Sequence, residues 1–136
     1  MAQEQRAGFQ SNPDIRRAVE KHAMKEAKKA LEKRGYGGFF DTSSSCPYDY
    51  TCSRNGTTFY VEVKDNQTAV RDIILTKNEV EHVRANQDTC ILVSVRNVKV
   101  SHKSPITASG GTPEVRERWQ VHRDDLRAIQ FVWTVK

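Results

Sequence analysis

The sequence predicts an α/β domain in which helices flank a mixed β-sheet. Three observations predict it: an amphipathic stretch beginning at Asn12, two strand-like segments meeting at Asn55-Gly56, and a capped helix after Thr76 that leads into the apolar run 89–95. A helix between two strands is typical of a crossover connection, and the two-residue turn is typical of a hairpin. Together these connections favour a sheet with both parallel and antiparallel pairs.

Size and composition indicate an ordinary globular protein. The 136 residues suffice to bury a core, no apolar run is long enough to span a membrane, and no signal-peptide pattern is visible. We therefore expect a cytoplasmic protein. The net charge of +5 favours a polyanionic partner, although an ordinary basic surface explains it about equally well.

The cysteines indicate neither a disulfide framework nor a zinc site. Cys46, Cys52 and Cys90 are odd in number and lack CxxC spacing. We expect all three to be reduced, with Cys52 and Cys90 in the core.

The first helix is predicted from Asn12-Pro13 to about Arg34. Residues 1–11 are polar and without pattern, so they form a lead-in to a single domain at 12–136. Asparagine is a favoured N-cap, and proline suits the first helical position. Small residues dominate the apolar stripe, which lets the helix lie close to a sheet: Ile15, Ala18, Val19, Ala23, Ala27, Ala30 and Leu31.

The hairpin around Asn55-Gly56 has a predictable register. Both central positions of a type I′ turn need positive φ, which this dipeptide accepts. The turn pairs Arg54 with Thr57, and the same register sets Asp49 directly opposite Glu62. The apolar side chains then share one face, in the pairs Tyr48–Val63, Tyr50–Val61 and Cys52–Phe59.

The second helix has a clear start. Thr76 and Glu79 form a capping box, and Leu75 and Val80 form a hydrophobic staple around it. The helix should end near Asn86. The continuous apolar run after it is typical of a central strand buried on both faces.

The other segments are less patterned. The "GGFFDT" motif predicts a short strand at 38–42, before the hairpin. Residues 98–114 are rich in Ser, Pro and Gly, so we expect a long mobile loop there. The segments 114–121 and 129–136 are compatible with edge strands, and their two tryptophans should pack in the core or on the sheet.

The hairpin carries a candidate metal site. Carboxylates directly across a ladder are destabilising, because their Cβ atoms lie only about 5 Å apart, so Asp49 opposite Glu62 points to a cation between them. Glu62 and Lys64 are two apart on one strand and project to one face. Paired carboxylates can hold Mg²⁺ for phosphodiester hydrolysis, and a lysine can orient or deprotonate the attacking water and stabilise charge. The Val63 carbonyl would add a ligand.

The tripeptide Glu62-Val63-Lys64 is weak evidence by itself. About one acid-x-Lys is expected by chance at this composition. A second copy, Glu26-Ala27-Lys28, lies in the first helix, where positions two apart point in different directions. The alternative to a metal site is a solvated hairpin face on which Lys64 screens two acids.

The segments "PYDY", "YVEVK" and "LTKNEVEHV", with the lead-in "GFQSNPDIRRAVEKHAM", together resemble the NO VEIN C-terminal domain family, itself similar to PD-(D/E)xK nucleases and especially to Mrr-like restriction endonucleases. The resemblance implies a restriction-endonuclease-like core with Mg²⁺ or Mn²⁺ as cofactor. It implies Asp49 and Glu62 as metal ligands and Lys64 as the catalytic lysine. Asp65 departs from the family pattern, which usually has Gly after the lysine.

For other charged residues the sequence gives weaker evidence of a functional role. Glu20 lies at the rim of the helical apolar stripe, where such nucleases sometimes bind a second metal or its water, but an ordinary surface glutamate fits equally well. Phosphate contacts are expected from Lys99, His102 and Lys103, and from Arg116 and Arg118 beyond them. They would supply salt-dependent affinity rather than sequence readout. A solvated charged loop is the alternative.

Two functional hypotheses follow. The first is a Mg²⁺-dependent DNA endonuclease that serves restriction, another form of host defence, or DNA repair. The second is an inactive nuclease-like module that binds DNA or protein beside an ATPase or methyltransferase. The complete set of three residues favours activity. The small size somewhat favours the second, because specificity would have to come from a homodimer or a partner subunit.

Overall fold

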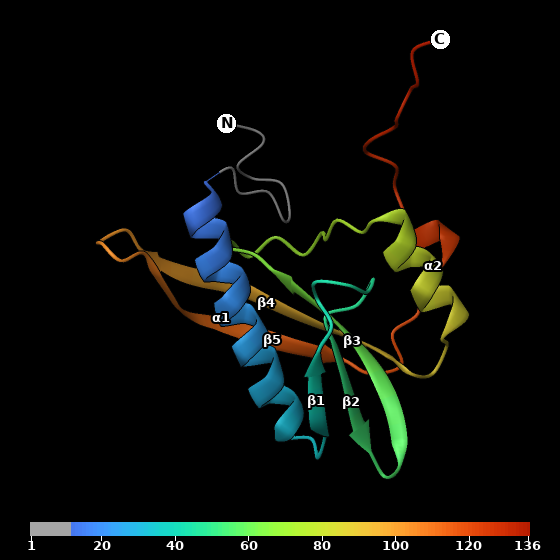
Figure 1. Cartoon of the computed structure of the whole chain (residues 1–136), viewed down its shortest axis with the longest axis horizontal. Helices are drawn as coiled ribbons and strands as arrows, with labels where there is room; N and C mark the ends of the chain where they lie inside the picture. Colours follow the sequence, from blue (N-terminus) through green and yellow to red (C-terminus); the bar gives the residue numbers. More distant parts are fainter. Residues whose placement is uncertain (1–11) are drawn as a thin grey trace.

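Five strands form one mixed sheet in the order β1-β2-β3-β4-β5, with helices on its two faces (Figure 1). The computed structural model describes residues 12–136, so the expected lead-in at 1–11 lies outside the described residues. The predicted α/β class, a mixed sheet flanked by helices, is confirmed. The elements are α1 (Pro13–Glu32), β1 (Gly37–Asp41), β2 (Tyr50–Arg54), β3 (Thr57–Asp65), α2 (Lys77–Ala85), β4 (Cys90–Ser101), β5 (Thr107–Arg116) and a 3-10 turn at Arg123–Asp125.

Helix α1 begins as predicted and lies across one face of the sheet. The Asn12 side chain accepts hydrogen bonds from the N–H groups of Asp14 and Ile15 (2.9 and 3.3 Å), and Pro13 occupies the first helical position. The helix ends at Glu32, two residues earlier than expected. Its buried stripe packs on the core strands and consists of Ile15, Val19, Ala23, Ala27 and Leu31.

The hairpin register is confirmed along the whole of β2. Pairing runs from Arg54 opposite Thr57 to Tyr50 opposite Val61, and the turn residues Asn55 and Gly56 have φ of 52° and 78°. Tyr50, Cys52 and Val61 are buried on the α1 face, and Phe59 packs against the same core.

The ladder changes at Asp49. Its N–H donates to the carbonyl of Val61 (2.8 Å), which is already the ladder partner of Tyr50. The pairing is therefore shifted by one residue, and Asp49 is not a regular ladder partner of Glu62. The prediction that Tyr48 joins the apolar face is wrong. The one-residue shift at Asp49 reverses the face of the sheet toward which the Tyr48 side chain points. The Tyr48 ring instead lies 4.9 Å from the ring of Tyr60 and 4.5 Å from that of His82, on the α2 face.

The crossover between β3 and β4 places α2 on the opposite face from α1. The two strands are parallel, with Val63 opposite Val93. The capping box at Thr76 is present, and the predicted staple residues pack in the cluster around Val83. Alternate residues of β4 enter the two cores: Ile91, Val93 and Val95 toward α1, and Cys90 and Leu92 toward α2.

The prediction of a long loop at 98–114 is wrong, because most of these residues belong to strands. Strand β4 continues to Ser101 and pairs with β5 from Thr107 onward, and only the short turn between them is irregular. Gly111 has φ of 92°, and a Cβ there would lie 2.9 Å from Cγ1 of Val95. The glycines that suggested a loop are instead required for a close approach within a ladder.

The C-terminal segments only partly follow expectation. Residues 114–116 end β5, after which the Trp119 N–H donates to the Cys90 carbonyl (2.8 Å). Trp119 is buried as predicted. The segment 129–136 forms no strand, and Trp133 is 80% exposed, so the expected packing is wrong there.

The sequence also predicts the state of the cysteines and the absence of a membrane-spanning helix. All three cysteines are free, Cys52 and Cys90 are buried as predicted, and Cys46 lies in the connection between β1 and β2. Within residues 12–136, no helix is both long and apolar enough to cross a membrane.

Candidate active site

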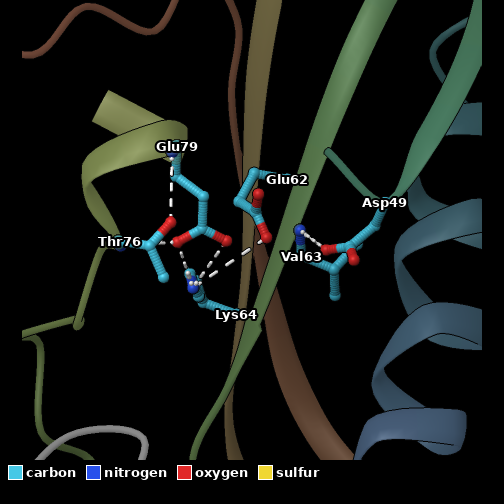
Figure 2. Close-up of polar contacts among 6 residues, drawn as sticks. All are labelled: Asp49, Glu62, Val63, Lys64, Thr76 and Glu79. Carbon is cyan, nitrogen blue, oxygen red and sulfur yellow. Dashed lines mark hydrogen bonds and ion pairs between the residues drawn. The ribbon is translucent and has the colours of Figure 1, made fainter. Parts of the chain in front are cut away.

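Asp49 is held at the start of β2 by hydrogen bonds on three sides. Its carbonyl accepts from the Thr42 N–H (2.8 Å), and its own N–H donates to Val61. Its carboxylate oxygen Oδ2 accepts from the Val63 N–H (2.8 Å), taking the place of a ladder partner (Figure 2). The side chain is therefore fixed at the edge of β3 rather than free in solvent.

The same hydrogen bond indicates the direction of the Val63 carbonyl. The N–H and C=O groups of one strand residue point to the same side, as in the paired bonds of an antiparallel ladder. Because the Val63 N–H points at Asp49, its carbonyl also faces the end of β2, where the regular ladder has stopped. The predicted third ligand atom thus lies on the Asp49 side of β3.

Glu62 is the acid most affected by its surroundings. It is 6% exposed, and it is the only buried charged residue in the part of the chain that the structure describes. Burial raises the pKa of its carboxyl well above the usual range, the Asp49 carboxylate raises it further, and Lys64 lowers it. The two acids predicted to face each other therefore interact, although not as a regular ladder pair.

Lys64 is bound mainly by a residue that the sequence did not assign to the site. Its ammonium lies 3.1 and 3.3 Å from the two carboxylate oxygens of Glu79 on α2, but 3.9 Å from the nearer oxygen of Glu62 (Figure 2). Glu79 also accepts a hydrogen bond from the Thr76 N–H (2.9 Å). The capping box explains this glutamate only in part, because it also connects α2 to β3.

Asp65 and Glu20 form a second acidic pair nearby. Burial raises the pKa of Asp65 to about 6, with further contributions from the charges of Glu20 and Asp49 that Lys64 opposes. Glu20 is an exposed residue of α1 and lines the same cavity. Asp65 is thus part of the electrostatics of the site.

All these side chains line one open cleft of about 1540 Å³ between α1, β3 and the start of α2. Its carboxylates come from five elements or connections, and its cations come mainly from α1. The carboxylates are Glu20, Asp41, Asp49, Glu62, Asp65 and Glu79, and the cations are Arg16, Arg17, Lys21, Lys25, Lys28 and Lys64.

Of the five residues expected to contact phosphate, only His102 lines this cleft, whereas Lys99, Lys103, Arg116 and Arg118 do not. Arg118 pairs with Asp88 (2.7 Å), and Arg116 lies 3.8 Å from Glu114. The sequence reasoning missed the basic side of α1. Its residues recur every three or four positions, the spacing that identified the buried stripe of the same helix.

The residues present are of the kind that suits Mg²⁺. Within residues 12–136, no three or more His, Cys, Asp and Glu side chains gather closely enough to hold a metal ion. Mg²⁺ commonly takes only one or two protein carboxylates and fills its other positions with water and substrate phosphate. Asp49, Glu62 and the Val63 carbonyl match that sparse set, and a cation would relieve the unfavourable charge of Glu62.

Comparison with known proteins gives one match. The family model described as "Protein NO VEIN, C-terminal" matches residues 19–108, about two thirds of the chain and all of the candidate metal ligands. No curated protein and no solved structure matches the chain significantly.

Proposed function

We propose that this chain, which belongs to the NO VEIN C-terminal family, is a Mg²⁺-dependent nuclease of the PD-(D/E)xK type that hydrolyses phosphodiester bonds in DNA. One observation carries the proposal: Asp49, Glu62 and Lys64 line the same cleft around the edge of β3. The mixed sheet is compatible with a restriction-endonuclease-like core. Restriction, another host defence, or DNA repair would be the biological setting.

The metal would be held by the carboxylates of Asp49 and Glu62 and by the Val63 carbonyl. When bound, Mg²⁺ supplies Lewis-acid polarisation of a phosphate and lowers the pKa of a coordinated water. The protein contributes pre-organisation, because Asp49 is fixed by its hydrogen bond to Val63 before any metal arrives. Burial of Glu62 keeps competing solvent away from one side of the site.

Lys64 would act on the phosphate and the attacking water. Its ammonium sits between Glu62 and Glu79, so its position is set by two carboxylates rather than by solvent. From there it can donate a hydrogen bond to a phosphate oxygen or orient the water, and so stabilise the charge that develops during attack. Glu79 acts through Lys64 and is a positioning residue.

The test is nicking of supercoiled plasmid DNA by purified protein in Mg²⁺ or Mn²⁺. The variants are Asp49→Asn, Glu62→Gln and Lys64→Ala, each expected to reduce the rate by about 100-fold or more. Lys77→Ala and Asp72→Asn are matched controls, since both side chains are highly exposed and neither lines the cleft. The controls should cut at the wild-type rate.

The result that would overturn the proposal is equally clear. If wild-type protein binds Mn²⁺ but nicks neither DNA nor RNA, the chain is not a nuclease and the binding-module hypothesis takes its place. Residual cutting that is equal in wild type and Lys64→Ala would indicate a contaminating enzyme and would count against the proposal in the same way.

A further inference from the structure

Three lysines on α1 differ in their pairing from most arginines of the molecule. Elsewhere, arginines are bound to acids: Arg34 and Arg54 to Glu117, Arg71 and Arg96 to Glu114, and Arg118 to Asp88. On α1, Arg17 pairs with Asp14 and Lys29 pairs with Glu26. Lys21, Lys25 and Lys28, in contrast, have no ion-pair partner within residues 12–136. Lys99 and Lys103 also have no ion-pair partner within residues 12–136, but they lie outside the cleft, so the lysines without a partner that line it all come from α1.

These three lysines and Arg17 form a row that faces the cleft. Arg17, Lys21, Lys25 and Lys28, here called the α1 basic row, follow one another at spacings of three or four and all line the cavity. Lys28 is partly oriented by the Phe39 ring, whose centroid lies 5.6 Å from the ammonium. The row is separated from the buried stripe of α1 by Glu20 and Met24, so it stands at the rim of the cleft.

The dimensions of the row suit a duplex backbone. Arg17 and Lys28 are eleven positions apart, so the row extends about 17 Å along the helix axis. One strand of B-DNA presents a phosphate every 3.4 Å along the axis, so the row extends over about five phosphates. Carboxylates lie deeper, around Glu62, and cations lie at the rim, so a polyanion would be attracted to the cleft while only one of its phosphates approached the acids.

We infer that the α1 basic row binds the phosphate backbone of duplex DNA and lays it along α1, with the scissile phosphate directed at Asp49 and Glu62. The inference rests on the proposed function for the identity of that phosphate, but not for the binding itself. Recognition by the row is electrostatic and carries no sequence information. The site expected from the sequence at Lys99, His102, Lys103, Arg116 and Arg118 is its direct competitor, and Lys99 and Lys103 represent it in the test below.

The test measures binding without catalysis. Fluorescence anisotropy of a labelled 20-base-pair duplex, in EDTA, compares the wild-type chain with Lys21→Ala/Lys25→Ala/Lys28→Ala. We expect affinity to fall about tenfold or more, and the slope of log K against log salt to decrease by about 3. Alanine is the best helix former, so α1 should persist, and an unchanged melting temperature would verify it.

Two further variants make the result specific. Lys29→Ala/Lys33→Ala/Lys77→Ala removes the same charge from residues outside the cleft and should keep most of the affinity. Lys99→Ala/Lys103→Ala tests the competing surface. The inference is overturned if the row variant binds like the wild type, if the charge-matched variant loses as much, or if the loss appears only with Lys99 and Lys103.

The inference and the proposed function can fail separately. Loss of binding in the row variant, together with a wild type that never cuts DNA, would support the surface and refute the nuclease. Cutting by a wild type whose row variant binds and cuts normally would leave the nuclease standing and refute the surface.

Discussion

The ammonium of Lys64 lies closer to Glu79, on the following helix, than to Glu62, its neighbour on the same strand. The candidate catalytic lysine is therefore positioned by α2 as well as by its own strand. Glu79 can serve both as a capping residue and as a lysine partner because it stands at the third position of α2, where its carboxylate reaches the end of the helix. Substitutions of Glu79 and of its capping partner Thr76 should therefore affect the free energy of unfolding and the nicking rate to different extents.

Glu79→Gln should separate the two roles. Glutamine keeps the capping box but removes the charge that binds Lys64. We expect plasmid nicking to slow by about tenfold, while the unfolding free energy falls by only about 1 kcal/mol. Thr76→Ala is the reciprocal variant: it should cost about 1 kcal/mol of stability through the lost cap and leave nicking nearly intact. Equal effects of both variants on nicking would argue against a positioning role.

Metal-free stability should depend on pH through Glu62. Its pKa in the folded state lies above the unfolded value, so folding is favoured at low pH and this contribution is lost as pH rises above about 4.5. The melting temperature in EDTA should therefore fall between pH 5 and pH 8. Glu62→Gln should flatten that decline and be more stable than wild type at pH 8, by at least about 1 kcal/mol. A wild-type melting temperature that rises over this range would contradict the assignment.

Asp65 should contribute a separate and narrower part of the same pH profile. Its pKa is raised from 3.8 to about 6, so its contribution to stability is lost over that interval and is constant above it. Asp65→Asn should alter the melting curve between pH 4 and pH 6 and leave the slope from pH 7 to pH 8 unchanged. An effect confined to the higher range would show that the two acids titrate in the opposite order.

Mg²⁺ or Mn²⁺ should stabilise the wild type more at pH 8 than at pH 5. A cation binds the folded site and must displace the proton of Glu62, which is easier when protons are scarce. At a metal concentration 100 times the dissociation constant, linkage gives about 2.7 kcal/mol. Asp49→Asn should lose this gain, while Asp72→Asn should keep it. Equal stabilisation of both variants would place the ion elsewhere.

Gly111→Ala should destabilise the protein. The sequence predicts a loop around Gly111, where an alanine would be tolerated, but the residue lies in β5. The new Cβ would lie 2.9 Å from Val95, at a position with φ of 92°, so both packing and backbone conformation resist it. We expect a loss of about 1–3 kcal/mol by chemical denaturation. Gly37→Ala is the control, since a Cβ at that position would have no neighbouring atom within 4 Å, and it should change stability by less than about 0.5 kcal/mol.

Much of the candidate site could be predicted because its elements are local. The Asn55-Gly56 turn sets the register of the hairpin, and alternation along β3 puts Glu62 and Lys64 on the same face. Asp49 was predicted as a regular partner of Glu62. Its actual place depends on a one-residue shift next to the turn at Thr42, which no local pattern indicates.

Sequence by itself determined the caps of both helices, the hairpin register along β2 and the buried strand, and it pointed to the three residues of the candidate site, because each depends on rules that act within a few residues. Only the tertiary structure decided that Glu79 binds Lys64, that the glycines near 110 belong to a strand, and that the cleft's cations come from α1. Those relationships join segments far apart in the chain. They arise from packing between elements, which periodicity within one element does not encode.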